Sequence, residues 1–168
     1  MANQEVDMKA LERLRGVSVF ERIKDNDEFL LRLMDVITYR KFGKGECIIR
    51  EDEIGEDMYI MMEGEVSIEK KTRGGDSYTV SKLKAPQNVF FGELALIDDD
   101  KRSATVITMV DSEFLVLNKH DFIGLCEKYP VLGWNTIFSI AKMISSHLRK
   151  TSKDMLAIFD ALVDEIDQ

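Results

Sequence analysis

Residues 57–69 read DMYIMMEGEVSIE, and along this stretch apolar and polar side chains alternate. The apolar side chains of one expected face are Met58, Ile60, Met62, Val66 and Ile68. Acidic side chains and Ser67 fall on the other face, with Tyr59 and Met61 as exceptions. Alternation of this kind is typical of half-buried strands. Because Gly64 lies in the middle, the stretch predicts two strands joined by a bend at that glycine.

Turn signals and further short strands surround this pair. Gly74-Gly75-Asp76 predicts a hairpin, and the strand after it would contain Tyr78, Val80 and Leu83. Residues 103–110 and 113–117 are apolar on both faces and rich in β-branched side chains, as expected of strands between two layers. Many short strands separated by turns are typical of a sandwich or a barrel. We therefore predict a mainly β fold, a jelly-roll β-barrel (double-stranded β-helix) over residues 42–118.

Helical periodicity flanks the predicted barrel on both sides. Residues 4–15 predict a short helix, and a second helix is expected from Asp25, where Asp25 and Glu28 form a capping pair. Its apolar residues recur at helical spacing as far as Ile37, so residues 1–41 are expected to hold N-terminal helices. Residues 119–168 are expected to hold C-terminal helices, the first of which ends at Pro130. The whole chain, residues 1–168, is predicted to be one domain.

The last segment, from about Val131 to Ile166, predicts one long helix. Seven apolar residues and one threonine follow a spacing of four and three without a break, at Ile137, Ala141, Ile144, Leu148, Thr151, Met155, Ile158 and Leu162. A narrow seam of this kind is typical of a coiled coil. At about 1.5 Å per residue the helix would be roughly 50 Å long, too long for this domain to bury alone. We expect a parallel homodimer through residues 134–166; the alternative is a single helix packed on its own barrel.

Composition and charge exclude several classes of protein. The 168 residues include 45% hydrophobic ones, enough for a core, but no apolar run is long enough to cross a membrane. A net charge of -8 argues against binding nucleic acid or anionic lipid, which needs clustered Lys and Arg. The chain starts without an apolar leader, and its two cysteines, Cys47 and Cys126, have no zinc-site or disulfide spacing. We therefore expect a cytoplasmic protein with reduced thiols.

Catalytic and metal-binding motifs are missing from the sequence. The glycine-rich nucleotide loops, the serine nucleophile elbow and the zinc-protease motif do not occur. The only histidines, His120 and His147, lie outside the predicted strands, which argues against a metal-binding barrel. Cys126 and His120 could form a nucleophile pair, but their surroundings are typical of a packed helix. We expect a protein that is not an enzyme and has no catalytic or metal-binding residues.

Residues 91–106, FGELALIDDDKRSATV, carry the chemistry of an anion site. Gly92 lets the backbone approach a ligand closely, and a helical turn over residues 93–97 would point free N–H groups at an anion. Glu93 can accept hydrogen bonds from a hydroxyl group. Arg102 offers a planar fork suited to a phosphate, and Ser103 adds a hydroxyl and an N–H beside it.

These residues resemble the phosphate-binding cassette of the cyclic nucleotide-binding domain family. The family pattern, F-G-E-[LI]-[AG]-L followed by R-[SAT]-A-T-V, is matched by Phe91–Leu96 and by Arg102–Val106. The resemblance covers about residues 17–152, including the opening at Phe42–Ile48 and the strand at Met58–Val66. It implies a cyclic nucleotide as ligand and no further cofactor.

The resemblance also implies roles for single residues. Glu93 would bind the ribose 2′-hydroxyl, and Arg102 would neutralise the cyclic phosphate. The backbone N–H groups near the phosphate would come from Leu94, Ala95, Ser103 and Ala104. Val80 and Leu83 would line the base and the sugar. The alternative for Glu93 and Arg102 is a structural ion pair inside a barrel that has lost its ligand, although such a pair is an expensive way to stabilise a fold.

A second resemblance concerns the base of the nucleotide. Leu148–Ser152 looks like the region in which a Thr-Ser pair of a cyclic AMP-binding activator contacts adenine, one residue coming from each subunit. Thr151 is a seam position, and a hydroxyl there costs stability unless it finds a partner. The match favours cAMP, whereas Ser103 neither demands nor excludes cGMP. The alternative for Thr151 is a polar seam residue that sets the register of the two helices.

Departures from the family pattern leave a second function open. Asn88 stands where the family commonly has glycine, Glu51-Asp52-Glu53 replaces a turn that often carries glycine, and Asp98, Asp99 and Asp100 would lie near an anion. The chain also ends where a DNA-binding module would start in transcription factors of this family. We predict a cAMP sensor that moves its C-terminal helix and signals to a downstream protein that the sequence does not identify. The alternative is a degenerate domain that binds proteins without nucleotide.

Overall fold

A computed structural model describes residues 2–72 and 74–166, and the side-chain surroundings of residues 8–72, 74–85 and 87–164. Its elements, in chain order, are α1 (Ala2–Gly16), η1 (Ser18–Phe20), α2 (Asp27–Met34), β1 (Ile37–Phe42), β2 (Cys47–Ile49), β3 (Asp57–Glu63), β4 (Glu65–Lys71), β5 (Ser77–Lys84), η2 (Ala85–Gln87), β6 (Phe90–Phe91), η3 (Glu93–Leu96), β7 (Thr105–Thr108), β8 (Ser112–Asn118), α3 (Lys119–Lys128) and α4 (Pro130–Ile166).

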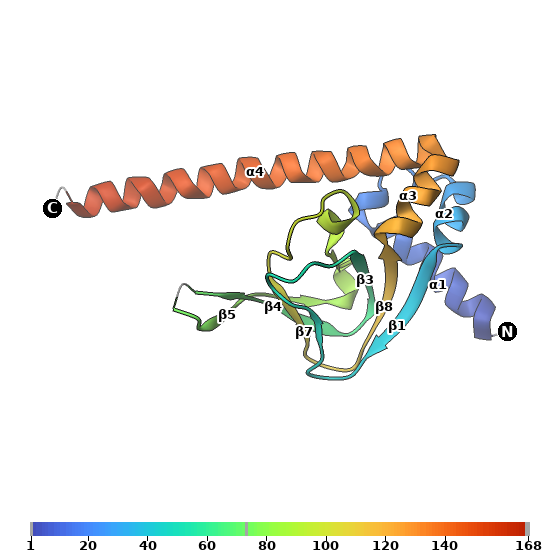
Figure 1. Cartoon of the computed structure of the whole chain (residues 1–168), viewed down its shortest axis with the longest axis horizontal. Helices are drawn as coiled ribbons and strands as arrows, with labels where there is room; N and C mark the ends of the chain where they lie inside the picture. Colours follow the sequence, from blue (N-terminus) through green and yellow to red (C-terminus); the bar gives the residue numbers. More distant parts are fainter. Residues whose placement is uncertain (1, 73, 167–168) are drawn as a thin grey trace.

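The strands form two antiparallel four-stranded sheets, in the orders β1-β8-β3-β6 and β2-β7-β4-β5. The two sheets face each other, and the helices gather at one end (Figure 1). This arrangement confirms the predicted jelly-roll barrel with N-terminal helices and a long C-terminal helix. The predicted bend lies at Gly64, whose φ is +116°, and the predicted hairpin after β4 has Gly75 at φ +91°.

Strand β3 is buried on both faces, which explains the exceptions in its alternating pattern. Tyr59 and Met61 point into the barrel, where Tyr59 stacks on Phe91 with ring centroids 5.5 Å apart. Met58 and Ile60 point the other way and pack against the helices. The prediction of a half-buried strand is therefore wrong for β3, because the helical layer covers the face that would otherwise meet water.

Two predicted boundaries differ from the structure. Strand β1 begins at Ile37, before the expected start of the barrel at residue 42, and Ile37 pairs with Leu117. Its middle residues are exposed, so the strand lacks the alternation that would have revealed it. Helix α2 is capped by Asn26 rather than Asp25, since the Asn26 side chain accepts from the Phe29 N–H at 3.0 Å.

Helix α4 packs against the domain through its first half and then runs past the barrel (Figure 1). On the face of α4 that meets the domain, Leu132, Thr136 and Ile140 are buried. Its opposite face is apolar and exposed along its length, at Trp134, Ile137, Phe138, Ile144, Leu148, Met155, Leu156, Ile158, Phe159, Leu162 and Val163. We call this set the α4 stripe. It is broader than the narrow seam predicted from the sequence, because exposed apolar residues outside the seam, among them Phe138, Leu156 and Phe159, lie beside it.

Candidate functional site

The predicted cassette forms a cavity of about 200 Å³. Its wall consists of η3 and the segment that leads to β7, and it contains six of the predicted site residues: Gly92, Glu93, Leu94, Ala95, Arg102 and Ser103. Asp98, Asp100 and Lys101 complete the lining. The structure therefore brings the glycine turn and the arginine together across the loop that separates them in the sequence.

Arg102 is held by the backbone of two other segments. Its Nη2 donates to the Asp57 carbonyl at 2.6 Å, and its Nη1 lies 3.3 Å from the Gly92 carbonyl. A Cβ atom at Gly55 would lie 2.6 Å from Arg102 Nε, and one at Gly92 would lie 2.8 Å from Nη1. The guanidinium group thus fits between two residues that have no side chain. Burial lowers the pKa of Arg102, although the group stays charged at any physiological pH.

Glu93 is the first residue of η3 and follows Gly92, whose φ of +78° makes the turn into the cassette. Burial raises the pKa of the Glu93 carboxyl group. The Glu93 backbone N–H, His147 of α4 and Arg102 act on this pKa in the opposite direction. Within the described part of the chain, the Arg102 guanidinium donates to carbonyl groups and not to the Glu93 carboxylate. The charge of Arg102 is therefore not neutralised by the predicted ion pair.

Three other predicted residues lie outside the cavity lining. Ala104 is half-buried just before β7. Val80 and Leu83 belong to β5 at the edge of the second sheet, where Leu83 packs against the barrel core. Val80 is exposed and sits at a bulge, since Ile68 pairs with Ser81 and Glu69 with Thr79.

Thr151 and Ser152 lie on the exposed part of α4 and do not line the cavity either. The Ser152 hydroxyl donates to the Leu148 carbonyl within the helix at 2.9 Å. Consecutive helical residues point about 100° apart. Thr151 and Ser152 are each three or four residues from Leu148 and Met155, so both lie beside residues of the α4 stripe.

Several contributors to the site were missed by the sequence analysis. Gly55 lies in the segment between β2 and β3, and the Asp57 carbonyl belongs to the first residue of β3. The backbone of the same segment also pairs with that of Arg102 at Asp52 and Glu53. The only available signal was the glycine itself, because a backbone carbonyl has no residue signature. Asp52 adopts a φ of +68°, so an aspartate takes the place that glycine often has in this turn.

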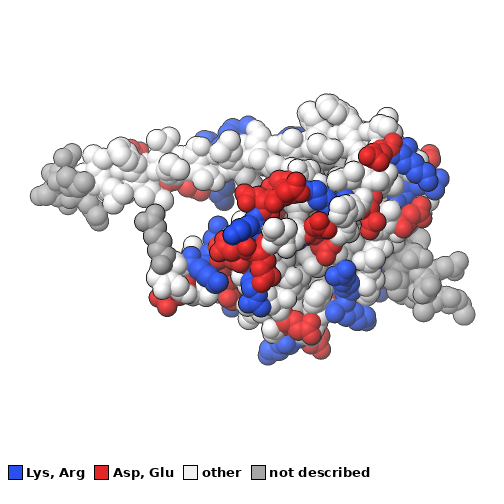
Figure 2. Space-filling view, in the orientation of Figure 1, with Lys and Arg blue, Asp and Glu red and all other residues white. Residues whose placement is uncertain are grey.

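The acidic loop of the cassette divides into two parts. Asp99 turns to Lys119, whose Nζ lies 2.6 Å from the Asp99 carboxylate and also donates to the Asp98 carbonyl. Asp98 and Asp100 line the cavity itself. Acidic side chains gather on the surface close beneath α4 (Figure 2).

Cys126 and the two histidines lie outside the lining of the cassette cavity. Burial raises the pKa of the Cys126 thiol to about 11, so this thiol is protonated at neutral pH. His120 lies 3.4 Å from the Glu56 carboxylate instead. Across residues 2–72 and 74–166, no group of three His, Cys, Asp or Glu side chains is placed to hold a metal ion. None of the helices described in those ranges is long and apolar enough to cross a bilayer.

Comparison with known proteins places this site in context. Residues 39–129 match the family model of the cyclic nucleotide-binding domain. The chain is 26% identical over 116 residues to the cyclic AMP receptor protein of Thermus thermophilus, covering 69% of this chain and 51% of that protein. It is 34% identical over 110 residues to human cGMP-dependent protein kinase 2, covering 65% of this chain and 14% of the kinase.

A solved structure confirms the fold. The cyclic nucleotide-binding domain of Methylobacillus flagellatus superposes with a TM-score of 0.75 at 20% identity, over 90% of this chain and 83% of that one. The chain spans about half the length of the Thermus protein and a seventh of the kinase.

Proposed function

The chain belongs to the cyclic nucleotide-binding domain family, and from this premise we propose that it is a sensor that binds cAMP in the cassette cavity. One observation carries the proposal. Arg102 presents a half-buried positive charge at the cavity, and its described hydrogen bonds go to the carbonyl groups of Asp57 and Gly92. A cyclic phosphate is an anion of the right charge for a guanidinium group held in this way.

Each part of the ligand would contact a different set of cassette residues. The Arg102 fork neutralises the phosphate, while the N–H groups of Leu94, Ser103 and Ala104 donate to its oxygens. The Ala95 N–H donates to the Gly92 carbonyl at 3.2 Å, so it would have to exchange that partner for the phosphate. The Glu93 carboxylate accepts the ribose 2′-hydroxyl. Val80 and Leu83 would approach the sugar and base from β5. Because neither lines the cavity, ligand binding would require the β4–β5 hairpin to move inward.

Selection of adenine is assigned to α4. The side chains of Thr151 and Ser152 leave the helix about 100° apart. One of them could therefore contact the base bound by its own chain, and the other the base bound by a partner chain. A hydroxyl group on each side suits the amino group and ring nitrogen of adenine. We therefore favour cAMP over cGMP.

Residues 134–166 are proposed to form the interface of a homodimer. The α4 stripe supports this, because Leu148 and Met155 are each 65% exposed and a contiguous apolar face of this length is unusual for a monomer in water. Binding at the cassette would shift α4 and so pass the signal to a downstream protein. We place this sensor in the cytoplasm, with no role in nucleic-acid or membrane binding.

A second candidate function is supported by the acidic lining of the cavity. Asp98 and Asp100 face the space that the phosphate would enter, and carboxylates there oppose an anion. A domain that uses the same fold as a protein-interaction module without nucleotide would tolerate this charge.

A thermal-shift titration with cAMP and with cGMP separates the two functions. A ligand at 100 times its dissociation constant stabilises the folded state by about 2.7 kcal/mol. We expect cAMP to raise the melting temperature at lower concentration than cGMP, and R102L to abolish both shifts while keeping the ligand-free melting temperature. R50L is the control, because it removes an exposed arginine of the neighbouring loop. Its melting temperature should rise with nucleotide as that of the wild type does. No shift at millimolar nucleotide would favour the interaction module.

A further inference from the structure

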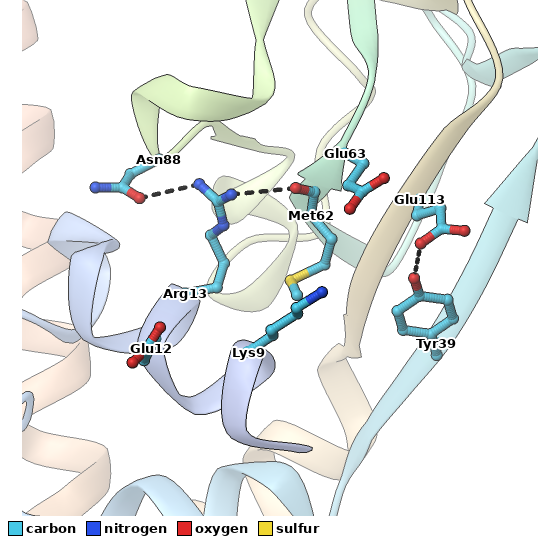
Figure 3. Close-up of a pocket in the computed structure, with 8 residues that line it drawn as sticks. All are labelled: Lys9, Glu12, Arg13, Tyr39, Met62, Glu63, Asn88 and Glu113. Atoms are coloured by element: carbon cyan, nitrogen blue, oxygen red, sulfur yellow. Dashed lines mark hydrogen bonds between the residues drawn. The ribbon is translucent and has the colours of Figure 1, made fainter. Parts of the chain in front are cut away.

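Arg13 connects the N-terminal helix α1 to the segment that precedes the cassette. Its Nη1 donates to the Ala85 carbonyl at 2.7 Å and to the Asn88 side-chain oxygen at 3.0 Å, and its Nη2 donates to the Met62 carbonyl at 3.1 Å. A cavity of about 490 Å³ lies beside it, between α1 and the strands β1, β3 and β8. Figure 3 shows Arg13 reaching from α1 along the wall of this cavity to Asn88 and Met62.

Asn88 has an uncommon backbone conformation, with φ +52° and ψ +44°. Glycine adopts this conformation most readily, and asparagine is among the few other residues that tolerate it. Its side chain also lies over the end of α1, since a Cβ atom at Gly16 would be 2.6 Å from Asn88 Nδ2. Compared with glycine, asparagine at this position adds the oxygen atom that Arg13 uses.

The chain runs directly from Asn88 into the cassette. The next residue, Val89, is buried, and its carbonyl accepts from the Met61 N–H at 2.9 Å. Strand β6 follows, pairing Phe91 with Tyr59, and then comes Gly92, whose carbonyl lies 3.3 Å from Arg102 Nη1. The short strand between Asn88 and the guanidinium group is paired with β3, and its second residue is buried. A displacement of Asn88 should therefore be passed on to Gly92 and not absorbed by a flexible loop.

We propose that Arg13 is a positioning residue for cyclic nucleotide binding and that, with Asn88, it couples the docking of α1 to the occupancy of the cassette. The inference rests on the proposed function. Arg13 touches no part of the cavity of Arg102; it acts by holding the segment 85–91 that delivers Gly92 and Glu93. Because coupling between two sites is reciprocal, nucleotide binding must tighten the docking of α1 by the same factor by which docking tightens binding.

The coupling is tested with R13M, N88G and the double variant, using calorimetric titration with cAMP. N88G keeps the left-handed backbone and removes only the side-chain acceptor. We expect R13M to weaken cAMP binding by about threefold to tenfold, in the lower part of the range for coupled neighbours. N88G should weaken it less, and the double variant should be no weaker than R13M. Additive losses would overturn the coupling between the two residues.

Hydrogen exchange of residues 8–16 supplies a second measurement, one that a purely structural role of Arg13 would not change. In the wild type, cAMP should slow exchange in α1; in R13M it should leave that exchange unchanged even at saturating nucleotide. R15M is the matched control, because Arg15 lies on the same helix and pairs with Asp27 and the Lys24 carbonyl instead. R15M should keep the wild-type affinity and the ligand-dependent protection.

The outcomes separate this inference from the proposed function. If the wild type binds cAMP and R13M behaves like R15M in both measurements, the role of Arg13 is wrong and the sensor stands. If the wild type binds neither cAMP nor cGMP, the sensor and the positioning role both fail. If R13M does not fold, R13K, which keeps the charge without the fork, should give an intermediate affinity; wild-type affinity in R13K together with N88G would refute the proposal.

Discussion

The position of the Arg102 guanidinium group depends on Gly55 and Gly92, and a side chain is excluded at these two positions for different reasons. Gly92 has a φ of +78°, so any side chain there strains the backbone of the cassette turn. Gly55 has no such backbone conformation, yet a Cβ atom on it would overlap Arg102 Nε at 2.6 Å. The absence of a side chain at Gly55 therefore serves the position of the guanidinium group and not the fold.

The G55A substitution should separate binding from stability. The end of the arginine side chain can move away from the new methyl group at little cost, so the ligand-free melting temperature should stay within about 2 °C of wild type. The displaced guanidinium group should weaken cAMP binding by about tenfold or more. G124A is the control, since a Cβ atom there meets nothing within 4 Å. Unchanged affinity in G55A would show that the position of Arg102 is not set by this contact.

Glu93 predicts a pH dependence of stability. Burial raises its pKa in the folded state, so folding favours the protonated carboxyl group. That contribution is complete below the unfolded pKa of about 4.3 and is lost as the pH rises through the higher folded value. The E93Q substitution should therefore raise the ligand-free melting temperature at pH 7, with a gain that shrinks toward pH 4.

The same E93Q variant should bind cAMP more weakly, because an amide accepts the ribose hydroxyl less strongly than a carboxylate. Thermal melts between pH 4 and pH 8, with and without cAMP, measure both effects. E127Q, at an exposed position of α3, should show neither. A lower melting temperature of E93Q at pH 7 would contradict the assigned cost of the buried charge.

At the scale of elements, α4 has two faces with different tasks. Leu132, Thr136 and Ile140 bury one face against the domain, and the α4 stripe leaves the other exposed. Beyond the barrel the described side chains of the helix are exposed, yet its apolar residues continue to Val163. A second copy of the helix is the simplest cover for such a face.

The M155K substitution should therefore convert a dimer into a monomer. A charge in the middle of the stripe would have to be buried without a partner, which a helical interface does not tolerate. Light scattering at micromolar concentration gives the mass, and A157K on the opposite face of the same turn should remain dimeric. If the wild type is itself a monomer at this concentration, the interface is wrong.

At the scale of the whole molecule, segments that are distant in the sequence meet at the cassette and next to it. Arg102 and Asp57 are 45 residues apart, and Arg13 and Asn88 are 75 residues apart. Helix α4 contributes His147 to the electrostatic surroundings of Glu93. In the proposed sensor, a ligand in the cavity would act on α1 on one side and on α4 on the other, and either helix could transmit the signal.

The net charge of -8 illustrates why whole-chain properties say little about one site. An acidic protein repels large polyanions, but one guanidinium group at short range decides the binding of a small anion because distant charges are screened within about 10 Å. Asp99 is paired with Lys119, so Asp98 and Asp100 are the acids of this loop that line the cavity, in addition to Glu93.

By itself the sequence determined the barrel, the long C-terminal helix and the joining of Gly92, Glu93 and Arg102 in one cassette, since alternation, helical spacing and motif order are local properties of the chain. Only the tertiary structure decided that β3 is buried on both faces, that the barrel begins at Ile37, that Gly55 shapes the place of Arg102 and that Arg13 reaches Asn88. These features depend on which segments pack against each other across many residues, and a carbonyl group or a space left by glycine has no periodic pattern from which that packing could be predicted.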